Sequence, residues 1–132
     1  GAESILRLCS KHDIPAAVLT NKHGPHARTV CDHLNLSQFL SFVMGANDTE
    51  WKKPDPMLTN FALSKFGFHA SETLYIGDSP YDFKTAELGG MDCALIATGT
   101  HLKGELQDLG CPLVFDNIDE FIETQFSSIF HT

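Results

Sequence analysis

Two carboxylates stand four positions apart in the stretch LYIGDSPYDFKTAELGG, which covers residues 74–90. Asp78 and Asp82 follow a short apolar run and a glycine, where the pattern predicts that a buried strand gives way to a helix. An acid at a helix start commonly accepts hydrogen bonds from free backbone N–H groups. Paired carboxylates are also the hard oxygen ligands that a divalent cation such as Mg²⁺ prefers. On these residues alone, helix capping and a metal site both stay open.

The elements that position these acids follow from the hydrophobic pattern. Short apolar runs predict five strands, over 16–20, 41–45, 73–77, 93–97 and 112–115. The first strand is expected to end in the polar turn TNKHGP. Strands that are apolar throughout and alternate with helices are typical of a parallel sheet covered on both faces. The sequence therefore predicts a Rossmann-like, three-layer α/β/α fold.

Helical spacing of apolar residues predicts the intervening helices. Helices are expected over 3–12, 27–34 and 81–88, the last stopped by the Gly89-Gly90 pair. Another helix, which Gly67 ends, is expected to bury a face made of Leu58, Phe61, Ala62 and Phe66. The last helix carries the apolar positions Ile118, Phe121, Ile122, Phe126, Ile129 and Phe130.

Polar groups of three kinds follow the first three strands. Thr20 and Asn21 come after the first strand, Lys53 lies in the connection KKPDP after the second, and Asp78 and Asp82 come after the third. Each alone fits a turn, a solvated lysine or a helix cap. Because the carboxyl ends of parallel strands share one sheet edge, we expect these groups to converge. A hydroxyl, an ammonium and two acids suit a phosphate group and its metal ion.

Three stretches resemble the haloacid dehalogenase superfamily, in particular its phosphoglycolate-phosphatase-like members. They are AAVLTNK, FVMGANDTEWKKPDP and ETLYIGDSPYDFKTAELGGMDCALIATG. Thr20 matches the family's second motif, Lys53 its third, and the pair Asp78 and Asp82 its fourth, in the form GDxxxD. The similarity runs from about residue 2 to residue 122.

The resemblance implies Mg²⁺-dependent hydrolysis of a phosphomonoester, with a small phosphorylated metabolite as substrate. Thr20 and the backbone N–H of Asn21 would bind the phosphoryl group, and Lys53 would offset its charge. Asp78 would coordinate Mg²⁺, and Asp82 would complete or steady the metal's shell.

The family's nucleophile lies in a D-x-D motif on a central strand, and no stretch of this chain matches that motif or the cap that follows it. We therefore expect residues 1–132 to form a single, partial core domain that is active only if the aspartate is supplied elsewhere. The alternative is a non-catalytic remnant that binds Mg²⁺ or phosphate, or serves as a partner subunit. Asp116, after the last strand, is weighed as a nucleophile, with helix capping as the default.

The absence of the central strand is expected to change how the remaining strands pair. The strands at 16–20 and 73–77 would flank that gap, so they either pair directly or present unpaired edges. We expect a rearranged sheet, a homo-oligomer or a missing N-terminal segment that covers it.

Composition indicates which classes of partner and which cellular compartment to expect. The 132 residues carry 17 acids and 9 bases, a net charge of −8, which argues against nucleic acid and anionic membranes as partners. No apolar run is long enough to span a bilayer, and the start lacks a signal peptide's apolar segment. Four scattered cysteines, three in apolar surroundings, indicate buried thiols and a cytoplasmic setting.

Overall fold

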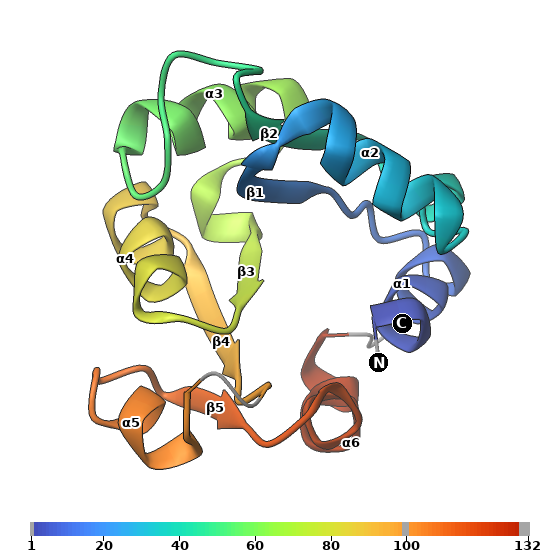
Figure 1. The fold of residues 1–132 in the computed structure, drawn as a ribbon. Helices are drawn as coiled ribbons and strands as arrows, with labels where there is room; N and C mark the ends of the chain where they lie inside the picture. Colours follow the sequence, from blue (N-terminus) through green and yellow to red (C-terminus); the bar gives the residue numbers. More distant parts are fainter. Residues whose placement is uncertain (1, 99–100, 130–132) are drawn as a thin grey trace. The chain divides into compact units, whose positions relative to one another are not determined.

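The structure, a computed structural model, describes residues 2–98 and 101–129 and divides the chain into two compact units. The N-terminal unit comprises Gly1–Lys52 together with Phe121–Thr132, and the central unit comprises Lys53–Glu120. Both units are built from helices and strands (Figure 1). One domain over residues 1–132 stays a prediction.

The elements alternate along the chain as the hydrophobic pattern predicts. The N-terminal unit holds α1 Ala2–Lys11, β1 Val18–His23, α2 Gly24–His33 and β2 Val43–Ala46, with a 3₁₀ turn at Ser37–Phe39. The central unit holds α3 Pro56–Phe66, β3 Leu74–Gly77, α4 Pro80–Gly89, β4 Asp92–Ile96, α5 Lys103–Gln107 and β5 Leu113–Phe115, with a 3₁₀ turn at Ala70–Glu72. Helix α6, Ile118–Ile129, begins in the central unit, and its residues from Phe121 onward belong to the N-terminal unit.

All strand pairs among the described residues are parallel, which confirms the predicted mixed α/β class with parallel sheets. The described strands form two sheets, with the orders β1-β2 and β3-β4-β5. The first sheet belongs to the N-terminal unit and the second to the central unit, so direct pairing across the gap stays a prediction. A partner that covers the remaining edges stays a prediction.

Strand β1 is longer than the sequence predicts. Instead of ending in a polar turn at Thr20, it continues to His23, which pairs with Ala46 of β2 after an irregularity beyond Leu19. Its last three residues are exposed, so their polar side chains stay in water while the backbone remains in the sheet. Thr20 and Asn21 therefore lie on a strand rather than in a turn.

The buried face of α3 also differs from the predicted one. Phe61 is 44% exposed, whereas Leu58, Thr59 and Ala62 are buried. Thr59 can be buried because its hydroxyl donates to the carbonyl of Pro56 at 3.0 Å. Gly67 ends the helix as predicted.

Two further differences concern the second half of the chain. The five-residue helix α5 was not predicted, since so short a helix shows no apolar period. In the last helix Phe121 is buried as predicted, whereas the side chains at 126 and 129 and the whole of residue 130 lie outside the described part.

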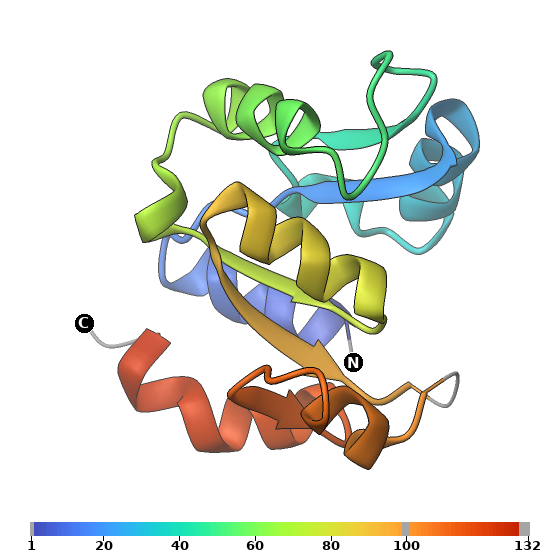
Figure 2. The same ribbon diagram turned by 90° about the vertical axis from the view of Figure 1, so that its left-hand side faces the viewer.

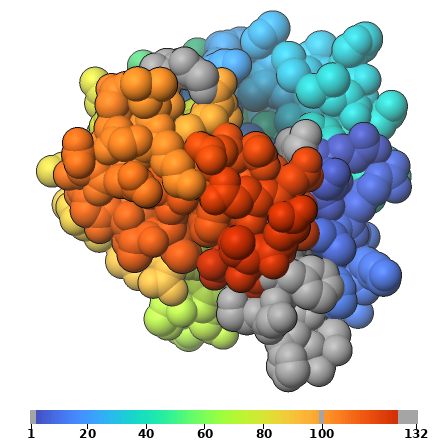
Figure 3. Space-filling model, turned by 90° about the horizontal axis from the view of Figure 1, so that it is seen from below, coloured from blue at the N-terminus to red at the C-terminus, as the bar shows by residue number. Residues whose placement is uncertain are grey.

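The core of the central unit lies between its sheet and the helices that pack on it. Helix α4 lies across β3 and β4 (Figure 2), and Gly90, in the left-handed region at φ 75°, ends it. Helix α5 lies on the surface (Figure 3), and Leu106 is its one buried residue. The buried members of this core are Ala86, Cys93, Leu95, Leu106, Cys111 and Val114. No described helix is long and apolar enough to cross a membrane.

The cysteines agree with the predicted buried thiols. Cys31, Cys93 and Cys111 are buried, and the structure joins none of the four cysteines in a disulfide. Burial raises the pKa of the Cys93 thiol to about 12, with the neighbouring Cys111 adding to the shift.

Replacing Leu95 by alanine is expected to lower the free energy of unfolding by about 2–5 kcal/mol, because a fully buried side chain leaves a cavity. Equilibrium urea denaturation measures this loss. Leu88→Ala is the matched control, since Leu88 is 46% exposed and should change the same quantity by less than about 0.5 kcal/mol. Similar losses in the two variants would contradict the assigned core.

Candidate functional site

The site centres on a buried ion pair between Lys53 and Asp82. Lys53 lies in the connection that leads to α3, and Asp82 lies in the first turn of α4. Nζ of Lys53 is 2.8 Å from Oδ1 of Asp82, and the two side chains are only 13% and 8% exposed. The structure thus brings together two of the predicted residues that stand 29 positions apart.

The carboxylate of Asp82 accepts four hydrogen bonds. Besides Lys53, Oδ1 accepts from the Tyr75 hydroxyl at 3.3 Å. Oδ2 accepts from the backbone N–H of Asp78 at 2.9 Å and from the Ser79 hydroxyl at 3.1 Å. Burial by itself would raise the pKa of Asp82, but the hydrogen bonds from Lys53 and Asp78 outweigh it and hold the pKa below its usual value. Asp82 is therefore ionised and fixed in one orientation.

Gly77 makes this arrangement possible, since it lets the Asp82 side chain lie directly against the backbone. A Cβ at residue 77 would stand 2.2 Å from Cβ and 2.4 Å from Cγ of Asp82. The glycine in the GDxxxD pattern thus has a steric reason: any larger residue would displace Asp82.

Asp78 does not cap α4. The cap is Ser79, whose hydroxyl oxygen accepts from the backbone N–H of Asp82 at 3.3 Å. Asp78 is exposed at the carboxyl end of β3, and its Oδ2 accepts a hydrogen bond from the Thr98 hydroxyl at 3.1 Å. Capping therefore does not explain this acid.

The two acids differ in what they offer a metal ion. Asp78 presents an exposed carboxylate, whereas both oxygens of Asp82 already accept hydrogen bonds. The described residues contain no group of three or more His, Cys, Asp or Glu side chains that could hold a metal. One or two carboxylates nevertheless suit Mg²⁺, which keeps several waters and takes other ligands from phosphate. Asp78 and Asp82 as metal ligands stay predictions, and the geometry favours a positioning role for Asp82.

Thr20 and Asn21 belong to the other unit. The Thr20 hydroxyl oxygen accepts from the backbone N–H of Lys22 at 3.1 Å, and Asn21 is exposed on β1. Because these residues lie in the N-terminal unit and Lys53 in the central one, their convergence stays a prediction.

The N-terminal unit contains an ion pair that the sequence analysis missed. Arg28 Nη1 and Nη2 donate to Oδ2 and Oδ1 of Asp48 at 2.8 and 3.3 Å, and Nη1 also donates to the carbonyl of Val43 at 3.1 Å. Asp48 Oδ2 accepts from the backbone N–H of Gly45 at 2.8 Å as well. The hydrogen bonds from Arg28 and Gly45 lower the pKa of Asp48. This pair ties α2 to the end of β2.

Asp116 is not a helix cap, contrary to expectation. The side chain of Asn117 caps α6, because its Oδ1 accepts from the backbone N–H of Glu120 at 2.8 Å. The Asp116 carboxylate instead lies 3.6 Å from Nζ of Lys103 and is 63% exposed. Its use as a nucleophile stays untested.

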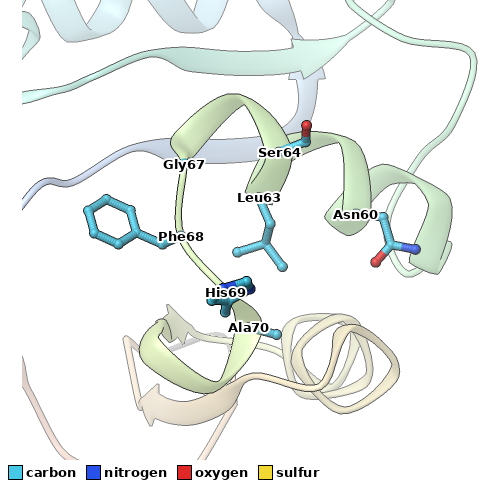
Figure 4. A pocket seen from close by; sticks show the side chains of 7 residues that line it. All are labelled: Asn60, Leu63, Ser64, Gly67, Phe68, His69 and Ala70. Atoms are coloured by element: carbon cyan, nitrogen blue, oxygen red, sulfur yellow. The ribbon is translucent and has the colours of Figure 1, made fainter.

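A surface hollow of about 400 Å³ lies beside the carboxyl end of α3 (Figure 4). Its lining residues are Asn60, Leu63, Ser64, Gly67, Phe68, His69 and Ala70. They lie on α3 and in the connection that enters β3, whereas Asp78 follows the far end of that strand. The hollow thus contains none of the predicted site residues.

Comparison with known proteins matches residues 1–96 to the family model of haloacid dehalogenase-like hydrolases. Among curated proteins, the phosphoglycolate phosphatase of Photorhabdus laumondii is 31% identical over 116 residues, which cover 87% of this chain and 49% of the relative. The phosphoglycolate phosphatase of Pseudomonas savastanoi is 26% identical over 122 residues, covering 92% and 45%. The chain thus spans about half the length of these relatives.

Solved structures show the same fold. A superfamily hydrolase from Ehrlichia chaffeensis matches with a TM-score of 0.77 and 27% identity, over 98% of this chain and 58% of that one. A predicted phosphoglycolate phosphatase from Haemophilus somnus matches with a TM-score of 0.83 and 20% identity, over 93% and 55%. At its lower identity, the second match shows the fold alone.

Replacing Gly77 by alanine is expected to displace Asp82 and to break its pairing with Lys53, at a cost of about 3–5 kcal/mol in the free energy of unfolding. Chemical denaturation measures this cost. Gly104→Ala is the matched control, because nothing lies within 4 Å of the Cβ that the alanine adds. Since residue 104 lies in helix α5, this change should raise the free energy of unfolding by about 0.5–1 kcal/mol. A Gly77→Ala protein as stable as the wild type would contradict the described packing.

The pH dependence of stability should report on Asp82. Its folded-state pKa lies below the ordinary value of 3.8, so its stabilisation is present above about pH 3.8 and is lost as the pH falls through the folded-state pKa. The difference in free energy of unfolding between wild type and Asp82→Asn should therefore be largest near neutral pH and shrink below pH 3.8. Denaturation at a series of pH values measures this, with Asp92→Asn as an exposed-acid control. A difference that does not depend on pH would refute the assignment.

Proposed function

Because this chain belongs to the haloacid dehalogenase-like hydrolase family, we propose that the protein is a Mg²⁺-dependent phosphatase acting on small phosphomonoesters. Two relatives that match most of the chain are phosphoglycolate phosphatases, so 2-phosphoglycolate is the first substrate to test. The chain spans about half of those relatives, so the activity belongs to this proposal and not to the comparison.

The observation that carries the proposal is the Lys53–Asp82–Asp78 arrangement at the carboxyl end of β3. Burial of two charges costs free energy unless both are well paired, so a chain that keeps such a pair at a sheet edge is a candidate for a functional site. Phosphoryl transfer needs positive charge beside the phosphate and a metal ion that neutralises the developing charge. Lys53 supplies the first, and Asp78 is an oxygen ligand for the second.

The contacts of Asp82, Lys53 and Thr20 support the roles proposed for them. Asp82 orients Lys53 through the 2.8 Å ion pair and orients the turn through the backbone N–H of Asp78. The hydroxyl oxygen of Thr20 accepts from the Lys22 backbone, which leaves its hydrogen to donate to a phosphate oxygen. The backbone N–H of Asn21 is proposed as a second phosphate donor. A bound Mg²⁺ would supply Lewis-acid stabilisation of the phosphoryl oxygens.

The protein should release phosphate from p-nitrophenyl phosphate and from 2-phosphoglycolate only when Mg²⁺ is present. Asp78→Asn should lower kcat/KM by about 100-fold or more, because one charged stabiliser of the transition state is lost. Phosphate release is followed by a colorimetric assay, with and without EDTA. Asp92→Asn, an exposed acid at the start of β4, is the matched control and should keep full activity.

Turnover that survives both EDTA and Asp78→Asn would contradict the proposal. No turnover, together with binding of phosphate that depends on Mg²⁺, would favour the non-catalytic alternative in which the same residues hold a metal and an anion.

A further inference from the structure

The carboxylates of the two acids in the turn after β3 differ in the number of hydrogen bonds that they accept. Asp82 accepts hydrogen bonds on both oxygens, while Asp78 accepts one, on Oδ2, from the Thr98 hydroxyl at 3.1 Å. Among the described residues, no side chain or backbone group donates to Oδ1 of Asp78. Thr98 is therefore the group that constrains the carboxylate of this exposed acid.

Thr98 follows the end of the neighbouring strand, β4, and its hydroxyl contacts Asp78. Strands β3 and β4 pair in register with Gly77 opposite Leu95, so the chains leave the sheet at the same edge. The residue before Thr98 is fixed as well, because the backbone N–H of Ala97 donates to the carbonyl of Phe115 at 2.8 Å. This bond continues the β4-β5 ladder beyond Ile96, the last residue of β4. The residue that precedes Thr98 is thus held by the sheet.

We propose that Thr98 is a positioning residue for Asp78: its hydroxyl holds Oδ2 and so keeps Oδ1 directed for a divalent cation. This inference rests on the proposed function. An exposed aspartate without such a partner samples several rotamers, and ordering it on binding costs free energy. Partners that orient a metal-binding carboxylate commonly change metal affinity by about 10- to 100-fold when they are removed.

A hydroxyl with no effect on metal binding could make the same contact. The two possibilities differ in whether a substitution that keeps the hydroxyl preserves Mg²⁺ affinity. Valine matches the shape of threonine and lacks the hydroxyl, whereas serine keeps the hydroxyl and lacks the methyl group. Thr98 is exposed, so neither change should alter the core. Thr73, the residue directly before β3, is the matched control: its hydroxyl donates to the carbonyl of His69 at 2.9 Å, at the other end of the strand.

The experiment titrates the native protein and its variants with MgCl₂ and measures the heat of binding by isothermal titration calorimetry. The Tm of each metal-free sample is measured by thermal unfolding. Thr98→Val should weaken Mg²⁺ binding by about 10-fold or more at unchanged Tm. Thr98→Ser and Thr73→Val should bind as the wild type does, and Asp78→Asn should lose binding.

The outcomes separate this inference from the function on which it rests. Wild-type affinity in Thr98→Val, with binding lost in Asp78→Asn, would overturn the role of Thr98 and leave the metal site in place. Equal weakening in Thr98→Val and Thr98→Ser would overturn it too, since the hydroxyl would then not be the acting group. A wild type that binds no Mg²⁺, or an Asp78→Asn variant that binds as well as the wild type, would overturn both.

Discussion

The ion pair between Lys53 and Asp82 is the constraint on which the arrangement at the carboxyl end of β3 depends. Removing two charges from water costs several kcal/mol for each ion, and the cost is offset only where good geometry and further hydrogen bonds satisfy both groups. Asp82 obtains those bonds from separate parts of the chain: the loop before α3, strand β3, and the turn into α4. The contacts that stabilise this part of the fold are therefore the same contacts that shape the site.

A consequence is that the two acids of one turn have different chemistry. Asp82 is neutralised by Lys53 and lies against Gly77, so it is a fixed part of the protein. Asp78 contributes its backbone N–H to that arrangement while its own carboxylate stays exposed. The carboxylate of Asp82 thus stabilises the turn, whereas the exposed carboxylate of Asp78 accepts a hydrogen bond from the Thr98 hydroxyl.

Much of this could be predicted from the sequence, because the informative signals were periodic or short-range. Five apolar runs predicted the strands, and the rule that chemistry lies at the carboxyl ends of parallel strands predicted that Lys53 and Asp82 meet. Thr98 and Tyr75 could not be found this way, since a threonine after a strand and a tyrosine within one carry no spacing signature. Phe61 shows the other limit: periodicity identifies an apolar face but not which neighbour covers it.

Local charge imposes a further requirement on the proposed chemistry. Lys53 carries one positive charge, and Asp82 and Asp78 carry two negative ones, so the turn is anionic before any ligand arrives. The chain as a whole has a net charge of −8, so it supplies no excess positive charge that would offset these acids. A phosphate group that approaches Lys53 is therefore also repelled by the charge of Asp78. A divalent cation on Asp78 would reverse the sign of that interaction. Under the proposed function, metal and phosphate should thus bind cooperatively, each raising the affinity for the other by the same factor.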